Sequence, residues 1–318
     1  MNSEPAYTTT DGPAGTSALT GRQAFTHALD KLTAIDARFG RIPSTGSPLR
    51  QLTEIFGKQS AAAIRQLVIE SAIGFDMKIY ATIPILRPYA IRDRSKRGGK
   101  NKVEGWGTPT LDGYFCDDNS LIKRLPQRLT IRSDDPRFNG RRVAAGWTAC
   151  HAWRTISDGR QASRYGSLNS FVPVLTWVPT ALARATDIEG SAPQSLLKSF
   201  AFAYKRTRPP DATRPYISRR WQLLDSAELS PVETTHRFAY DEGFVRNRVT
   251  SIYKVSVALS DVTQPSLVKT LSSRYTTGLR SLDPKRAQRL SAALRSYAES
   301  IEQAAGFGLS CSYDPFPE

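Results

Sequence analysis

The 318-residue sequence is poor in histidine, cysteine and methionine, with three, three and two of each. Cys116, Cys150 and Cys311 form no Cys-x-x-Cys pair, so we expect neither a zinc knuckle nor a disulfide framework. A reducing cytoplasm is then the simplest setting for the chain. No apolar run reaches the length of a membrane-spanning helix, roughly 18 residues or more, so no membrane partner is expected.

The sequence also lacks several motifs that identify common enzymes. It has no P-loop, no glycine-rich dinucleotide fingerprint and no G-x-S-x-G, which leaves nucleotide-driven and esterase chemistry unsupported. Residues 1–18 have neither the basic nor the apolar region of a secretory signal. We predict a disordered leader over these residues.

Positive charge is abundant, because 44 Lys and Arg face 29 Asp and Glu and give a net charge of +15. Such a balance favours a polyanionic partner, and we expect nucleic acid, specifically double-stranded DNA. The positive charge is concentrated in segments 87–102 and 205–220. A homodimer is possible, because the sequence does not determine the oligomeric state. The predicted phosphate contacts are Arg92, Arg94, Lys96, Arg97, Lys100, Lys102, Arg206, Arg208, Arg219 and Arg220.

Hydrophobic periodicity predicts an α+β fold. Helices are expected at 21–38, 59–72, 179–204 (with a break near 190–193) and 281–306, the last capped by Asp283. Strands are expected at 75–86 and 141–153 and within 234–260, including 248–259. Helices therefore lie at both ends of the chain, around a central mixed β region.

The same pattern suggests a division of the chain after the basic segment. Residues 19–102 form a helical and basic part, and residues 103–318 form an α+β part. A single domain over 19–318 is the alternative, because the length fits one large domain or two ordinary ones.

One histidine lies in a distinctive setting, the stretch GWTACHAWRTISDG at 146–159. His151 ends a predicted strand, an Asp-Gly turn follows, and Asn169 comes 18 residues later, before an apolar stretch and a helix. Residues 146–187 thereby resemble the HNH, or His-Me finger, nucleases, in which a β-hairpin precedes a helix and the ββα unit binds a metal.

The resemblance implies roles for particular residues. His151 would be the general base, Asn169 would hold the loop, and Arg154 would contact a phosphate. Asp187 would help to bind Mg²⁺ or another divalent cation. In the family an acidic residue or histidine commonly precedes the catalytic histidine, whereas this chain has Cys150 there.

A second interpretation of His151 needs no chemistry. A strand histidine can simply donate to a backbone carbonyl, with Trp147 and Trp153 as core aromatics. As a base it would need a neutral imidazole at neutral pH, which its ordinary pKa of about 6.5 permits.

Two further groups of residues are candidate sites. Asp117, Asp118 and Asn119 are adjacent oxygen ligands that could supply metal contacts, although Asp and Asn also suit helix caps. Glu70, Asp76 and Lys78 resemble parts of a PD-(D/E)XK nuclease, although charged residues at a strand edge explain them more simply. His27 and His236 have no neighbouring metal-ligating residue in the sequence, so no metal chemistry is expected there.

Together these patterns predict a metal-dependent DNA endonuclease that hydrolyses phosphodiesters, by analogy of the restriction or defence type. The alternatives are a non-catalytic nucleic-acid-binding protein, a PD-(D/E)XK-type nuclease, or a different enzyme whose site is the 113–120 loop.

Overall fold

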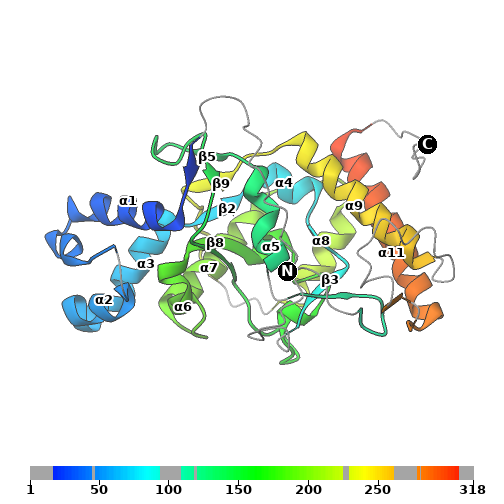
Figure 1. Ribbon diagram of the computed structural model, residues 1–318, viewed down its shortest axis with the longest axis horizontal. Coiled ribbons are helices and arrows are strands. Elements are labelled where there is room, and N and C mark those ends of the chain that lie inside the picture. Colours follow the sequence, from blue (N-terminus) through cyan, green and yellow to red (C-terminus); the bar gives the residue numbers. More distant parts are fainter. Residues whose placement is uncertain are drawn as a thin grey trace, which may run out of the picture.

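A five-stranded mixed sheet forms the centre of the computed structural model (Figure 1). The structure describes residues 17–44, 47–93, 109–117, 120–224, 229–260, 278–279 and 281–307. The strand order is β5-β9-β2-β8-β7. Their bounds are β2 Ile73–Phe75, β5 Ile131–Ser133, β7 Trp147–His151, β8 Leu175–Pro179 and β9 His236–Phe238.

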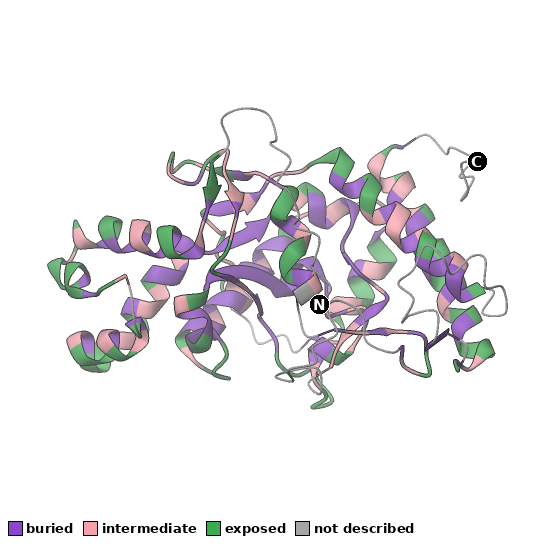
Figure 2. Cartoon of the chain, viewed as in Figure 1, coloured by how far each residue is buried: buried purple, intermediate pink, exposed green. Residues whose placement is uncertain are grey.

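The middle of this sheet is buried on both faces. All residues of β2 and β8 are buried, as the purple arrows in Figure 2 show. β2 pairs in parallel with β9 and antiparallel with β8. Phe75, Trp177 and Phe238 meet edge-on or tilted, with ring centroids 5.2–5.3 Å apart. These aromatic contacts fix the three central strands against one another.

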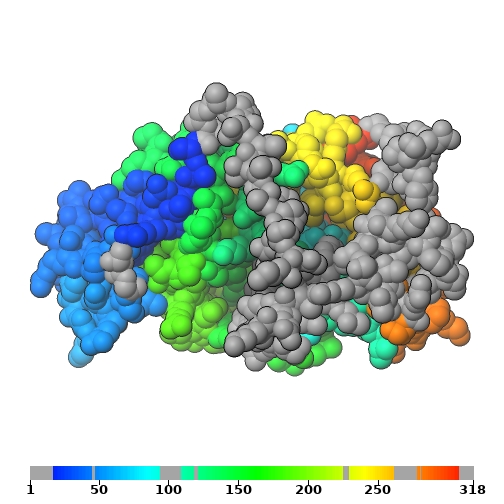
Figure 3. Space-filling view, viewed as in Figure 1, coloured from blue at the N-terminus to red at the C-terminus, as the bar shows by residue number. Residues whose placement is uncertain are grey.

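Helices cover the sheet and extend the molecule at both ends (Figures 1 and 3). One end holds α1 (Gly21–Thr33), α2 (Pro48–Phe56) and α3 (Ser60–Ser71), shown in blue. At the other end α9 (Glu242–Ser260) packs along α11 (Pro284–Ala305). Further α-helices in the described part of the chain are α4 (Met77–Thr82), α5 (Ser120–Arg124), α6 (Thr180–Thr186), α7 (Ala192–Ala203) and α8 (Arg214–Trp221). Within the described ranges, no helix is long and apolar enough to cross a bilayer.

Two small parallel pairs complete the β structure. β1 (Ala18–Leu19) pairs with β6 (Arg142–Val143), and β3 (Ala90–Arg92) pairs with β4 (Phe115–Asp117). The first pair brings the start of α1 close to β7. A Cβ on Gly21 would lie 1.8 Å from the carbonyl oxygen of Gly146, so this approach requires glycine.

The α+β expectation is confirmed, with helices at both ends and a mixed sheet between them. The expected break in the 179–204 helix separates α6 from α7, and Asp283 caps α11 through the backbone N–H of Arg286.

Two strand predictions were wrong. The predicted 75–86 strand ends at Phe75, because the Asp76 carboxylate accepts from the Lys78 N–H and starts helix α4. The predicted 248–259 strand lies inside α9, whose buried positions recur at helical spacing.

A buried tyrosine fixes the central strand. The Tyr204 hydroxyl accepts from the Phe75 N–H at 2.8 Å and donates to the Phe75 carbonyl at 2.7 Å.

Tyr204→Phe should lower the free energy of unfolding by about 1–3 kcal/mol, since it leaves two buried backbone groups unpaired. Urea denaturation measures the loss. Tyr216→Phe is the control, because its exposed hydrogen bond to Ser296 should matter little; equal effects of both changes would contradict the prediction.

Candidate functional site

The His151 region forms a strand, a second strand and a helix, in the order that the family resemblance predicts. β7 and β8 pair antiparallel from Trp147–Pro179 to His151–Leu175, and α6 follows β8 directly. Asp187 is the C-cap residue of α6. The hairpin and helix are therefore present, while a metal finger is not confirmed.

His151 is held by a backbone carbonyl. Its Nε2 lies 2.8 Å from the Asn169 oxygen. A carbonyl only accepts, so in the neutral ring Nε2 carries the proton and Nδ1 is the acceptor. Burial lowers the pKa of His151, which the Asn169 carbonyl and the Asp187 charge oppose. The ring is thus neutral at pH 7, with one nitrogen able to accept a proton.

Asn169 is completely buried, and its side-chain Oδ1 and Nδ2 have no hydrogen-bond partner among the described residues. Buried amide groups without partners are rare in folded proteins and indicate a water, an ion or a functional role. The Asn169 main-chain carbonyl accepts from His151, whereas a role of its side chain in holding the loop stays a prediction.

The other predicted catalytic and metal residues do not assemble around His151 into a ligand set. Arg154 donates to the main-chain oxygen of Asp187. Asp117 accepts from the Leu121 N–H at 3.2 Å, as a helix cap does, and Asp118 lies outside the described residues. Throughout the described ranges no three His, Cys, Asp or Glu residues are placed to hold a metal. The residues present therefore do not fit a ready-made divalent site.

The three residues that resemble a PD-(D/E)XK site, Glu70, Asp76 and Lys78, each interact with a different partner. Glu70 pairs with Lys31 at 2.6 Å, and Asp76 pairs with Arg132 at 2.7 Å. The Lys78 ammonium lies over the Tyr240 ring, 4.0 Å from its centroid. Asp76 is a helix N-cap rather than a strand residue. These interactions explain the three side chains without a catalytic role.

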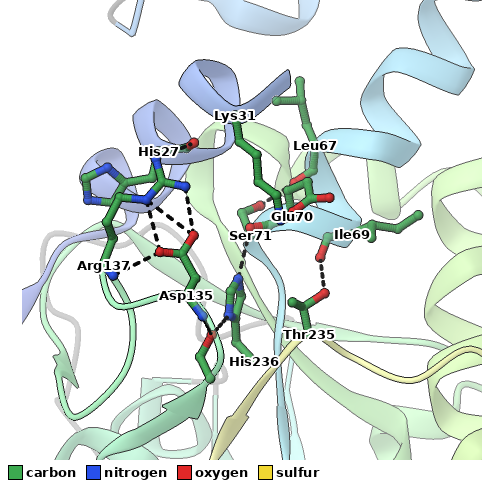
Figure 4. A network of polar contacts seen from close by, with 11 residues as sticks. His27, Lys31, Leu67, Ile69, Glu70, Ser71, Asp135, Arg137, Thr235 and His236 are labelled. Atoms are coloured by element: carbon green, nitrogen blue, oxygen red, sulfur yellow. Dashed lines mark hydrogen bonds and ion pairs between the residues drawn. The ribbon is translucent and has the colours of Figure 1, made fainter. Parts of the chain in front are cut away.

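His236 belongs to a network that joins the N-terminal helices to the sheet (Figure 4). Its Nδ1 accepts from Ser133 at 2.7 Å, and its Nε2 donates to the Glu70 carbonyl at 3.0 Å. The ring is stacked on Phe138 with centroids 3.7 Å apart and is 1% exposed. The serine–histidine pair is thus closed to a substrate, and its role is structural.

The structure describes only some of the arginines and lysines that were predicted to contact phosphate. Arg94, Lys96, Arg97, Lys100 and Lys102 lie outside the described residues, and Arg92 is partly buried in β3. Arg206, Arg208 and Arg219 are exposed, whereas Arg220 is partly buried and donates to the Tyr216 carbonyl. Each of these remains a predicted phosphate contact.

A basic cleft lies between the 120–128 segment and the first turns of α9. It has a volume of about 540 Å³. Its walls come from α5, the 3₁₀ helix η4 (Leu125–Arg128) and α9, together with Arg87. The cationic residues that line it are Arg87, Arg124, Arg128, Arg248 and Lys254. Among the described lining residues Asp241 is the one acid, and its carboxylate accepts from the Phe244 N–H.

Sequence reasoning missed these five residues as a group. Arg87 begins the predicted basic segment, and Arg124 and Arg128 lie in the LIKRLPQRL stretch, which carries three cationic side chains. Because a strand was predicted at 248–259, Arg248 and Lys254 were not placed on one helix. In the structure both lie in α9, which begins directly after Asp241. Only the tertiary fold brings the three segments together.

The cleft and the His151 hairpin are joined by one segment. Ser170 accepts from the Leu86 N–H at 3.0 Å through its carbonyl and from the Arg87 N–H at 2.7 Å through its hydroxyl. The preceding residue, Asn169, accepts from His151. The Arg87 main chain and the His151 ring are therefore hydrogen-bonded to neighbouring residues of the same short stretch of chain.

Comparison of the chain with known protein families, with curated proteins and with solved structures found no match. A function must therefore be argued from the geometry and charge of its own residues.

All three histidines should titrate below 6.5, because burial lowers each pKa. A folded-state pKa below the unfolded value means that stability is complete above pH 6.5 and falls as the pH drops below it. Asp135, with a pKa lowered to about 2 by Arg137, titrates outside this window. Imidazole NMR titration, assigned with single histidine variants, and urea unfolding between pH 7 and 5 check this. A His151 that titrates at or above 6.5 would contradict it.

Proposed function

We propose that this protein binds nucleic acid in the basic cleft between the 120–128 segment and α9. The carrying observation is the concentration of five cationic side chains against one carboxylate, Asp241, which is engaged at the start of α9. Phosphate groups are the common anions that arginine binds through paired hydrogen bonds. A net charge of +15 adds long-range attraction for a polyanion.

The electrostatics of the cleft support a ligand of opposite charge. Burial lowers the pKa of Arg248; its interactions with the Tyr89 side chain, a hydrogen bond among them, oppose this, while the positive charges of Arg87 and Arg128 lower the pKa further. Like charges held together in a partly dehydrated site destabilise the free protein. A bound phosphate would relieve this repulsion.

Removing cleft arginines should weaken binding and its dependence on salt. Arg124→Ala/Arg128→Ala should flatten the log–log slope of affinity against salt by roughly 0.7–0.9 for each lost phosphate contact. Fluorescence anisotropy over a salt series measures the slope.

The matched control is Arg50→Ala/Arg289→Ala, which removes the same charge from exposed positions outside the cleft. It should lower affinity only slightly and leave the slope nearly unchanged. Equal slopes for the two double variants would refute a phosphate role for the cleft.

Phosphodiester hydrolysis at His151 is a second candidate function. Three observations favour it: the hairpin–helix order, the neutral imidazole with Nδ1 as acceptor, and the unpartnered buried amide of Asn169. A divalent cation such as Mg²⁺ remains a prediction of the family resemblance.

His151→Ala should reduce cleavage of plasmid DNA by about 10²- to 10⁴-fold, the usual effect of losing a general base. Affinity for DNA should survive, because phosphate contacts come from arginine and lysine. Nicking is assayed with Mg²⁺ and with chelator, and melting curves report the folded fraction.

His236→Ala is the matched control, since His236 is also a strand histidine hydrogen-bonded to a backbone carbonyl, and it is fully buried. It should lose stability but keep its activity per folded molecule. A His151→Ala protein that behaves in the same way would end the hydrolase hypothesis and leave the binding function intact.

A further inference from the structure

One arginine of the basic cleft has hydrogen-bonding capacity that the described protein does not use. Arg248 donates from Nη2 to the Ser251 hydroxyl at 3.1 Å. Its Nη1 is buried and has no hydrogen-bond partner in the part of the chain that the structure describes. A buried cationic donor without an acceptor is costly unless a ligand supplies one.

Arg87 extends the same site. It is 8% exposed and lines the cleft, and its charge acts on Arg248. Its main chain is fixed by Ser170, whose hydroxyl accepts from the Arg87 N–H. A phosphate that reaches this arginine must therefore enter the cleft, because almost none of the side chain lies at the outer surface.

The size of the cleft limits what can enter. A volume of about 540 Å³ lies within the usual range for small-molecule pockets, roughly 300–1,000 Å³. A duplex presents its phosphates on a stiff, wide surface and contacts protein over roughly 1,000–2,500 Å². A single strand can bend one phosphate into a hollow of this size.

We propose that Arg87 and Arg248 form a subsite for one phosphate group of single-stranded nucleic acid, either an internal phosphodiester or a terminal 5′-phosphate. The inference rests on the proposed nucleic-acid binding and names the strand form and the residues that select it. The other cationic residues, Arg124, Arg128 and Lys254, then contact flanking phosphates on the strand.

The test compares probes on the wild-type protein and on Arg248→Met, which keeps an unbranched side chain but removes the charge. The probes are a 3′-fluorescein oligothymidylate with a 5′-hydroxyl, the same strand with a 5′-phosphate, and a duplex of equal length. Inorganic pyrophosphate serves as competitor and as ligand in melting experiments.

We expect the wild type to bind the single strand more tightly than the duplex. Arg248→Met should weaken single-strand binding by about 10- to 100-fold, the usual effect of losing charge-assisted hydrogen bonds. Pyrophosphate should compete with the strand and raise the melting temperature of the wild type but not of Arg248→Met. A preference for the 5′-phosphorylated strand assigns the terminal phosphate, and equal affinity assigns an internal one.

Stability separates this role from a structural one. Without ligand, Arg248→Met should melt at the same temperature as the wild type or higher, because the repulsion from Arg87 and Arg128 is gone. Arg246→Ala is the control on the same helix, where an exposed arginine pairs with Glu242. It should leave strand binding within about twofold, as expected of an exposed ion pair.

The possible failures are distinguishable. If the wild type binds nucleic acid and Arg124→Ala/Arg128→Ala weakens it while Arg248→Met does not, the subsite is refuted and the binding function stands. Duplex binding as tight as single-strand binding refutes the strand preference. A wild type that binds neither probe overturns the proposed function itself.

Discussion

Both candidate sites depend on the segment 169–172, which is hydrogen-bonded on two sides. On one side His151 donates to the Asn169 carbonyl at 2.8 Å. On the other, Leu86 and Arg87 donate to Ser170, and Val172 donates to the Pro84 carbonyl at 2.8 Å. The segment is buried, so these bonds are protected from water and the groups they satisfy cannot easily be hydrated instead. A displacement of the segment would therefore move the imidazole and the wall of the cleft together.

Among the described arginines, two groups differ in their electrostatic surroundings. Arg50, Arg132 and Arg246 pair with carboxylates, at distances of 2.7–2.8 Å. Arg248 instead lines the basic cleft together with Arg87 and Arg128. Among the described lining residues the one acid is Asp241, whose carboxylate accepts from the Phe244 N–H at the start of α9. Desolvation and like-charge repulsion both act against this arrangement in the free protein. A ligand of opposite charge would lower this cost.

Local signals in the sequence were sufficient for α1, α3, α11 and strand β7, whereas β8 was anticipated only as an apolar stretch before a helix. Asp283 before Pro284 marks the start of α11, and Pro193 lies in the first turn of α7. They failed for residues 75–86 and 248–259, where β-branched and aromatic residues are frequent. Residues 77–82 instead form a helix because Asp76 caps it, and residues 248–259 form part of a helix because α9 packs against α11. His151, Asn169 and Asp187 could be associated from their spacing. Arg87, Arg128 and Arg248 could not, because Arg248 lies more than 100 residues from the other two and only the fold brings them together.

Binding and hydrolysis make different demands on this geometry. A cleft of about 540 Å³ lined by cations can accept a phosphate as it stands. A general base must also meet a water or hydroxyl within about 2.6–3.2 Å of the accepting nitrogen. Burial keeps His151 neutral, and the Asn169 carbonyl leaves Nδ1 as the acceptor. His151 is only partly exposed, so its surroundings restrict the approach of substrate to that atom. Hydrolysis therefore requires access to Nδ1 in addition to everything that binding requires, which is why binding is the function that this arrangement of residues supports first.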